Sequence, residues 1–296
     1  MPAKQTMKPK TAFEIRGGGA QLRTGCPAID TCLRGGFRVG GITEISGESS
    51  SGKTQLCLQL SIQCQRSILE GGLEGGTLYV FCEGTFPVAR LEEMAGGNRS
   101  LLDHIFVEHA DSAEELWTVI SSPKLHSALA KGIIKLVVID SLTSIIRGEF
   151  SSSRQDLSDR ADTLFAFAGR MKRLASLYDC LFLVINQVSG VFEKYPAPAG
   201  MADSFLPNGH ELNQTALIPP LKVSPSLGIV WSTCVNTRVM LHRIEDPSRA
   251  QVVTRALKTN VITFAPVLRE LRILLSSRLP TSSCRFIVTR KGLVDE

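Results

Sequence analysis

Residues 47–54 have the types and the spacing needed to bind a nucleoside triphosphate. They read Gly47-Glu48-Ser49-Ser50-Ser51-Gly52-Lys53-Thr54, which fits the pattern G-x-x-x-x-G-K-S/T. The two glycines permit a tight backbone bend whose amide groups point inward at phosphate oxygens. Lys53 can then bridge the β- and γ-phosphates, and the Thr54 hydroxyl can ligate Mg2+. The sequence therefore predicts that ATP and Mg2+ bind at this loop.

An apolar run that ends in Asp140 supplies a second signal for the same chemistry. Residues 136–139 are Leu-Val-Val-Ile, and a buried strand that ends in an acid can place a carboxylate beside the metal, often through a water molecule. Many buried strands end in Asp at a turn, so this pattern alone is weak. Combined with the 47–54 loop, it predicts Thr54 and Asp140 as the magnesium-binding residues.

Two more polar residues follow apolar runs and could act on the terminal phosphate. Glu83 follows residues 77–81, and Gln187 follows residues 181–185 together with Asn186. Ligands of open α/β sheets gather at the carboxyl ends of strands. There, Glu83 could orient an attacking water and an amide could sense the γ-phosphate. Ordinary turn and strand-end hydrogen bonding is the alternative for both positions.

The elements that must position these residues alternate in type along the chain. Strands are expected at 42–46, 77–81, 105–107, 133–139 and 181–185, and helices at 54–69 and 156–178. Because these strands lack polar alternation, both faces of a parallel sheet should be covered by helices. Further strands at 238–241, 270–275 and 285–289 are expected to extend the sheet in antiparallel fashion. Residues 190–225 read as a long loop, which in a compact domain is usually functional or disordered.

Composition narrows the class of protein. The chain has 296 residues, of which 43% are hydrophobic, and a formal net charge of +5. It has no apolar run of the roughly 18 residues that a membrane helix requires, and the polar start of the chain does not fit a secretory signal. Eight scattered cysteines without a C-x-x-C pair favour reduced thiols over metal or disulfide sites. The expected location is the nucleus or the cytoplasm, without a membrane.

The charge is unevenly distributed. After residue 237 the chain carries eleven Lys and Arg residues against five Asp and Glu. A solvated basic face and a nucleic-acid surface are equally compatible with this excess.

Motifs spread over residues 21–292 resemble RecA-type recombinases. The segments that carry the resemblance are Thr24-Gly25-Cys26-Pro27, Gly41-Ile42-Thr43-Glu44-Ile45, Gly52-Lys53-Thr54-Gln55-Leu56, Glu83-Gly84-Thr85-Phe86, Ile139-Asp140-Ser141, Ile185-Asn186-Gln187-Val188 and Arg278-Leu279-Pro280. Residues 146–150, 225–231 and 279–284 are more similar to the eukaryotic paralogues than to the strand-exchange enzyme. The resemblance implies an α/β RecA-like P-loop NTPase core at 21–296, after a flexible lead-in at 1–20.

The resemblance also implies residue roles. Glu83 matches the water-activating glutamate, which makes Lys53, Glu83 and Gln187 the expected catalytic residues. Gln187 matches the amide that links the γ-phosphate to the second DNA loop, expected at 189–224. Arg90 matches an arginine that packs on adenine, with Gln55 among the nucleotide contacts. Arg147 and Arg154 would belong to the first DNA loop.

Several departures from the family pattern shape the expected function. Both expected DNA loops are close to neutral, whereas DNA affinity depends on neutralising phosphates. The family's acidic residue that caps the ATP of a neighbouring subunit is replaced here by Leu275 or Ser276. The family's Phe-x-x-Ala polymerisation element is not matched either, because the chain reads Phe13-Glu14-Ile15-Arg16. No counterpart of the N-terminal helical DNA-binding domain of eukaryotic relatives is found. These departures favour a pairing subunit over a filament builder.

The expected protein is therefore an ATP-dependent DNA-binding subunit of homologous-recombination repair of double-strand breaks and cross-links. It would be a weak DNA-dependent ATPase that forms a heterodimer with another paralogue, the C-type one, and could also contact the strand-exchange recombinase. Its DNA would be single-stranded or branched. The alternative is a scaffold subunit that holds ATP structurally and does not bind DNA. A small-molecule P-loop kinase is disfavoured because the sequence has no Arg-rich lid.

Overall fold

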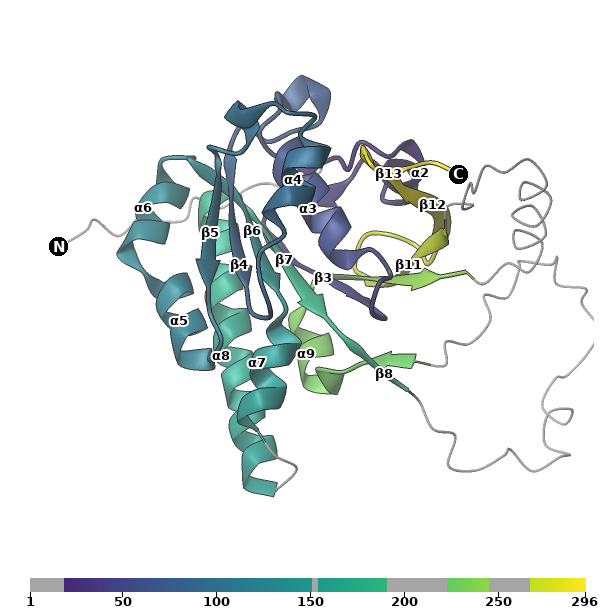
Figure 1. Cartoon of the computed structure of the whole chain (residues 1–296). Helices are drawn as coiled ribbons and strands as arrows, with labels where there is room; N and C mark the ends of the chain where they lie inside the picture. Colours follow the sequence, from purple (N-terminus) through teal and green to yellow (C-terminus); the bar gives the residue numbers. More distant parts are fainter. Residues whose placement is uncertain (1–18, 151–153, 191–222, 245–266) are drawn as a thin grey trace, which may run out of the picture.

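One large twisted sheet runs through the molecule in the computed structural model, which describes residues 19–150, 154–190, 223–244 and 267–296 (Figure 1). Nine strands of these residues join in the order β13-β12-β11-β10-β3-β7-β6-β4-β5. Their bounds are β3 (Gly41–Gly47), β4 (Gly76–Phe81), β5 (Ile105–His109), β6 (Ile134–Asp140), β7 (Leu181–Asn186), β10 (Thr237–Arg243), β11 (Leu268–Ser276), β12 (Ser283–Thr289) and β13 (Gly292–Val294). Two short ribbons pair β1 (Gln21–Leu22) with β2 (Phe37–Arg38), and β8 (Val188–Gly190) with β9 (Val223–Pro225).

The strands from β10 to β5 in this order are parallel, and β11, β12 and β13 are antiparallel additions. The predicted mostly parallel sheet with an antiparallel carboxyl-terminal part is therefore confirmed. The prediction was wrong for residues 238–241, because β10 lies parallel to β3, with Val239 opposite Ile45. A parallel neighbour requires a crossover, and helix α9 (Gly228–Cys234) precedes β10 and returns the chain to the start of β3, where the Asn236 N–H donates to the Ile42 carbonyl.

Helices cover both faces of the sheet, as the apolar strands predict (Figure 1). One face packs against α2 (Pro27–Cys32), α3 (Lys53–Gln63) and α4 (Val88–Met94); the other packs against α5 (Ala113–Ser121), α6 (Pro123–Ala130), α7 (Leu142–Glu149), α8 (Arg154–Tyr178) and α9. Successive residues of β6 serve the two cores in turn. Leu136 and Val138 belong to the first core, and Val137 and Ile139 to the second. This alternation follows from the two-residue period of a strand.

Helix α3 is shorter than the helix expected at 54–69. It ends at Gln63, and a separate 3-10 turn, η1 (Ile68–Glu70), follows. Ser67 and Glu70 form a reciprocal capping box that starts the new turn, and Gly71 ends it in the left-handed region with φ of 87°. Helix α8 agrees with the prediction to within two residues at its start. A second 3-10 turn, η2 (Arg99–Leu101), precedes β5.

Some expectations fall on residues beyond this description. Most of the expected lead-in (1–18) and most of the long loop (191–222) lie outside the described residues. Among the helices of the described residues, none is both long and apolar enough to cross a membrane. Six of the eight cysteines are buried, which agrees with the predicted partly buried thiols, and their reduced state stays a prediction.

Candidate nucleotide-binding site

Most of the predicted phosphate-binding residues, both predicted metal-binding residues and the predicted catalytic residues meet in one cavity at the carboxyl ends of the parallel strands, whereas Gln55, Arg90 and Arg147 do not line it. The cavity has a volume of about 530 Å3. It is lined by Gly47, Glu48, Ser49, Ser50, Lys53, Thr54, Glu83, Asp140, Ser141, Ile185, Gln187 and Val188. Strand β3 leads into the 47–54 loop and α3 leaves it, while β4, β6 and β7 bring Glu83, Asp140 and Gln187 to the same edge. Short sequence motifs from four places in the chain thus form one site.

The 47–54 loop has the tight backbone that its glycines predict. A Cβ on Gly47 would lie 2.2 Å from the Leu241 carbonyl oxygen, so no larger residue fits there. Gly52, with φ of 105°, stands directly before the first turn of α3. The Ser51 hydroxyl is buried and has no hydrogen-bond partner within the described residues. Such a cradle at a helix amino terminus fits a phosphate group, because unpaired amides and the helix dipole both favour an anion.

Lys53 lies across the loop that precedes it. Its Nζ donates to the carbonyl oxygens of Gly47, at 2.8 Å, and Glu48, at 2.6 Å. Burial lowers the pKa of this ammonium, while the nearby Asp140 carboxylate raises it. A cation held by neutral carbonyls over an anion cradle is suited to exchange these contacts for phosphate oxygens.

Asp140 is held by two hydroxyl groups. Thr54 Oγ1 donates to Asp140 Oδ2 at 2.9 Å, and the Tyr79 hydroxyl donates to the same oxygen at 2.6 Å. Burial raises the pKa of Asp140, and the two hydroxyl donors and Lys53 lower it. The sequence predicted that Thr54 and Asp140 bind Mg2+ together, and the structure brings these two side chains into contact. An oxygen-rich pair of this kind matches the ligand preference of Mg2+.

Sequence reasoning missed Tyr79. Its phenol is almost fully buried in β4, and the ring packs edge-on against Phe86 with centroids 5.0 Å apart. The available signal was a tyrosine between the apolar residues Leu78 and Val80 of the strand, since a buried tyrosine hydroxyl needs a partner.

Glu83 and Gln187 also meet in the cavity. Gln187 Nε2 donates to the Glu83 carboxylate, at 3.2 Å and 3.4 Å from its two oxygens. Gln187 Oε1 accepts from Arg147 Nη1 at 3.2 Å. Asn186, the other amide considered from the sequence, is fully buried and turned away from the cavity, where it bonds Glu44 and Thr143. The catalytic roles of Glu83 and Gln187 stay predictions.

Arg90 and Gln55 are joined beside the loop. Arg90 Nε donates to Gln55 Oε1 at 2.7 Å, and Arg90 Nη2 donates to the Thr289 carbonyl at 2.6 Å. Arg90 also forms an ion pair with Glu93. These contacts fix the Arg90 guanidinium next to α3, and its contact with adenine stays a prediction.

The two expected DNA-binding residues lie in helices and not in a loop. Arg147 lies in the last turn of α7, and Arg154 is the first residue of α8. The Arg147 Nη2 group donates to the hydroxyls of Ser189 and Ser226, both at 2.8 Å. Its guanidinium thus contacts β8 and the residue that follows β9, and Arg147 is nevertheless exposed. DNA binding by Arg147 and Arg154 stays a prediction.

Part of the basic carboxyl-terminal excess is neutralised within the fold. Arg238 forms a buried ion pair with Glu44 at 2.5 Å, and Arg272 pairs with Glu270 at 2.7 Å. These two cations are therefore not available to a nucleic acid. Of these two pairs, only the Arg238 pair lowers the excess, by one charge, because Glu270 is already among the five acids counted after residue 237.

Comparison with known proteins agrees with this fold. Residues 16–212 match the Rad51 family model. The DNA repair protein XRCC3 homolog of Arabidopsis thaliana is 32% identical, over 97% of this chain and 97% of its own length. The DNA repair protein XRCC3 of Bos taurus is 32% identical, over 92% of this chain and 74% of its own length. The DNA repair and recombination protein RadA of Metallosphaera sedula is 37% identical, over 60% of this chain and 57% of its own length.

The family match covers more than half of the chain, and the XRCC3 homologues extend the similarity over most of it. The resemblance to recombinase paralogues that the motifs carry is therefore confirmed. The chain belongs to the Rad51 family.

Proposed function

We propose that this protein is an ATP- and Mg2+-binding subunit of homologous-recombination repair of double-strand breaks and cross-links. The observation that carries the proposal is the single cavity that joins the 47–54 loop to Thr54, Asp140, Glu83 and Gln187. The biological role is supported by the similarity to relatives that are named DNA repair protein XRCC3 and DNA repair and recombination protein RadA. A protein with this role would work in the nucleus, and the cytoplasm is the alternative location.

The residues of the cavity, and Arg90 and Gln55 beside it, suit different parts of the nucleotide. The amides of the loop and the Lys53 ammonium would bind the β- and γ-phosphates. Thr54 and Asp140 would hold Mg2+, whose charge offsets the negative charge that develops during phosphoryl transfer. Arg90 and Gln55 would flank the base. Glu83 would accept a proton from, or orient, the attacking water, and Gln187 would report the terminal phosphate through its contact with Glu83.

Replacing Glu83 with glutamine is expected to slow ATP hydrolysis by about 100-fold, because a positioned general base contributes on that order. The affinity for nucleotide should stay within about 3-fold, since the phosphate contacts are unchanged. Phosphate release and titration with a fluorescent ATP analogue measure the two effects. Glu114→Gln, at an exposed position on α5, is the matched control. Equal hydrolysis rates for wild type and Glu83→Gln would remove Glu83 from the reaction.

A partner subunit has a suitable surface at the outer edge of the sheet. Strand β5 is the last strand in the order, so its outer edge is open to pair with an extended segment. Beside it lies a mainly apolar groove of about 460 Å3 between β5 and helices α5 and α6. Phe106 and Ile133 line the groove and are 42% and 47% exposed. These features support a heterodimer with a second recombinase paralogue, the C-type one, or contact with the strand-exchange recombinase.

The change Phe106→Asp is expected to weaken co-purification with the C-type paralogue by about 10-fold or more, because a charge would replace a large apolar contact. Leu69→Asp is the matched control, since Leu69 is 95% exposed on η1 and does not line the groove. Nucleotide affinity should be unchanged in both variants. Undiminished co-purification of Phe106→Asp would exclude this groove as the partner surface.

DNA binding and a scaffold role without DNA are the two candidate outcomes for the complex. Single-stranded or branched DNA is the proposed ligand, with Arg147 and Arg154 as contacts. The exposed side of Arg147 supports DNA binding, whereas the ion pairs of Arg238 and Arg272 favour the scaffold.

Binding of single-stranded DNA to the heterodimer across a salt series separates these two functions. A DNA-binding subunit is expected to lose affinity as salt rises, with a slope of about −0.7 in log K against log salt per phosphate contact. Arg147→Ala should make that slope shallower by roughly one contact. A slope near zero would favour the scaffold with structural ATP.

A further inference from the structure

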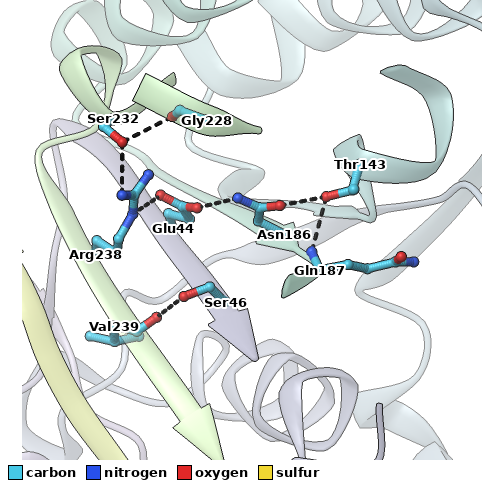
Figure 2. Close-up of polar contacts among 9 residues, drawn as sticks. All are labelled: Glu44, Ser46, Thr143, Asn186, Gln187, Gly228, Ser232, Arg238 and Val239. Carbon is cyan, nitrogen blue, oxygen red and sulfur yellow. Dashed lines mark hydrogen bonds and ion pairs between the residues drawn. The ribbon is translucent and has the colours of Figure 1, made fainter. Parts of the chain in front are cut away.

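A chain of hydrogen bonds, buried at its centre, crosses the sheet behind the nucleotide site and connects α9 with the backbone of Gln187 (Figure 2). Five side chains form it, and we call them the polar relay: Ser232, Arg238, Glu44, Asn186 and Thr143. They come from α9, β10, β3, β7 and α7 in that order. None of the five lines the nucleotide cavity.

The half of the polar relay nearer α9 contains its ion pair. Ser232 Oγ donates to the Gly228 carbonyl at 3.0 Å and accepts from Arg238 Nη1 at 2.8 Å. Arg238 Nε donates to Glu44 Oε2 at 2.5 Å. The Glu44 side chain has no exposed surface. Since a buried charge must be paired, Glu44 fixes the position of the Arg238 guanidinium.

The other half leads from Glu44 to the nucleotide site. Asn186 Nδ2 donates to Glu44 Oε1 at 2.5 Å, and Thr143 Oγ1 donates to Asn186 Oδ1 at 2.7 Å. The Gln187 N–H in turn donates to Thr143 Oγ1 at 3.0 Å. Glu44, Asn186 and Thr143 are all fully buried. Bulk water therefore cannot replace the bonds that join these three side chains.

The direction of every bond follows from the charge on Glu44. A carboxylate paired with arginine only accepts, so the NH2 group of Asn186 must face it and the amide oxygen must face Thr143. Thr143 must then give its one proton to that oxygen, which leaves its lone pair for the Gln187 N–H. A change at one end of such a network alters the donors and acceptors available at the other.

We infer that the polar relay is a positioning device, which holds the Gln187 backbone against the nucleotide cavity and couples it to α9. The side chain of the same residue is held separately, between Glu83 and Arg147. The polar relay thus holds the backbone N–H of Gln187, whereas Glu83 and Arg147 hold its side-chain amide group. The benefit to hydrolysis rests on the function proposed above, whereas the coupling to α9 does not.

The coupling can be tested in the full-length chain without nucleotide. Ser232→Ala removes the outermost member of the polar relay and is expected to speed hydrogen exchange at the Gln187 amide by about 3-fold. Thr233→Ala is the matched control, because the Thr233 hydroxyl bonds the Val230 carbonyl in the same helix and lies outside the polar relay. Residue-resolved amide exchange by NMR gives the readout. Equal Gln187 exchange in the two variants would overturn the inference.

A double-mutant cycle sharpens the test. Thr143→Val takes away the acceptor of the Gln187 N–H and is expected to speed its exchange by about 10-fold. Adding Ser232→Ala should then change nothing further, because the connection is already cut. Effects that multiply to about 30-fold would mean that the two residues act independently, which would overturn the coupling. Ser46→Ala controls for loss of a buried hydroxyl, since Ser46 Oγ bonds the Val239 carbonyl beside the polar relay (Figure 2).

The benefit to hydrolysis has its own readout. Thr143→Val is expected to keep nucleotide affinity within about 3-fold but to slow phosphate release by about 10-fold, since a misplaced group affects the reaction more than binding. Release at the wild-type rate would refute the positioning role. A wild-type chain that takes up no nucleotide would instead count against the proposed function, and the exchange results would still decide the coupling.

Discussion

Replacing Lys53 with alanine is expected to lower the affinity for ATP with Mg2+ by about 100-fold. The variant loses the only side-chain ammonium that lines the described cavity, which lies 2.8 Å from the Gly47 carbonyl. A charged hydrogen bond to phosphate contributes about 1.5–3 kcal/mol, and a factor of 100 corresponds to about 2.7 kcal/mol. Titration of wild type and variant with a fluorescent ATP analogue, with the partner subunit present, measures the difference.

The control for this prediction is Lys131→Ala, which removes an exposed lysine at the end of α6. It should bind nucleotide as wild type does. Thermal unfolding without nucleotide should show that Lys53→Ala is folded, because Nζ contacts only two loop carbonyls. A Lys53→Ala protein that binds ATP normally would refute the proposed nucleotide site. One that assembles and supports repair normally would make nucleotide incidental to function.

The change Arg238→Leu is expected to lower the free energy of unfolding by about 3–5 kcal/mol, the usual effect of leaving one member of a buried ion pair unpaired. Burial raises the pKa of Glu44, and Arg238 and Asn186 lower it. Without the guanidinium, the folded-state pKa should rise further above the unfolded value. The folded variant then holds a proton that the unfolded chain releases, so its stability should fall as pH rises through that window. Urea unfolding at pH 6 and pH 8 tests both effects.

The double variant Glu44→Gln/Arg238→Leu separates charge from packing. Glutamine keeps an acceptor for Asn186 Nδ2 and carries no charge, so the double variant should recover a large part of the lost stability and the pH dependence should disappear. An equal loss in the single and double variants would mean that the packing of the Arg238 side chain, not the unpaired carboxylate, controls stability.

The parts of the site that the sequence predicts best are local. The 47–54 loop is recognisable because its glycines, lysine and threonine act within one turn and need no distant partner to define them. Asp140, Glu83 and Gln187 were predicted because strand ends of a parallel sheet share one edge, and the cavity does bring them together. Their positions follow from topology and do not require knowledge of side-chain contacts.

Long-range pairing limited the remaining predictions. Strand β10 was expected to be antiparallel, but its direction depends on how the chain returns from β7 through α9, and the intervening residues show no periodic pattern. Arg147 was expected in a loop and lies in α7 instead. Its partners Ser189 and Ser226 lie far along the chain, and nothing in the local sequence indicates them.

The polar relay was missed for a related reason, although one signal was present. Glu44 is the only charged residue of β3, a strand whose neighbours are buried on both faces. A carboxylate in that setting requires a cation and a hydrogen-bond donor. Their identities depend on the register that puts Arg238 and Val184 opposite Glu44, with Asn186 beside them, and this register is not encoded locally.

The place of β3 in the sheet has a consequence for biosynthesis. This strand leaves the ribosome early, but its two neighbours are β7, which begins at Leu181, and β10, which begins at Thr237. Until both have been translated, a strand that is fully buried in the folded protein and leads into the phosphate loop has no partner on either side. Such late, distant pairing is slow and leaves nascent chains prone to aggregation. A chaperone is therefore expected to hold the growing polypeptide, and ribosome-bound fragments that stop before residue 243 should not retain nucleotide.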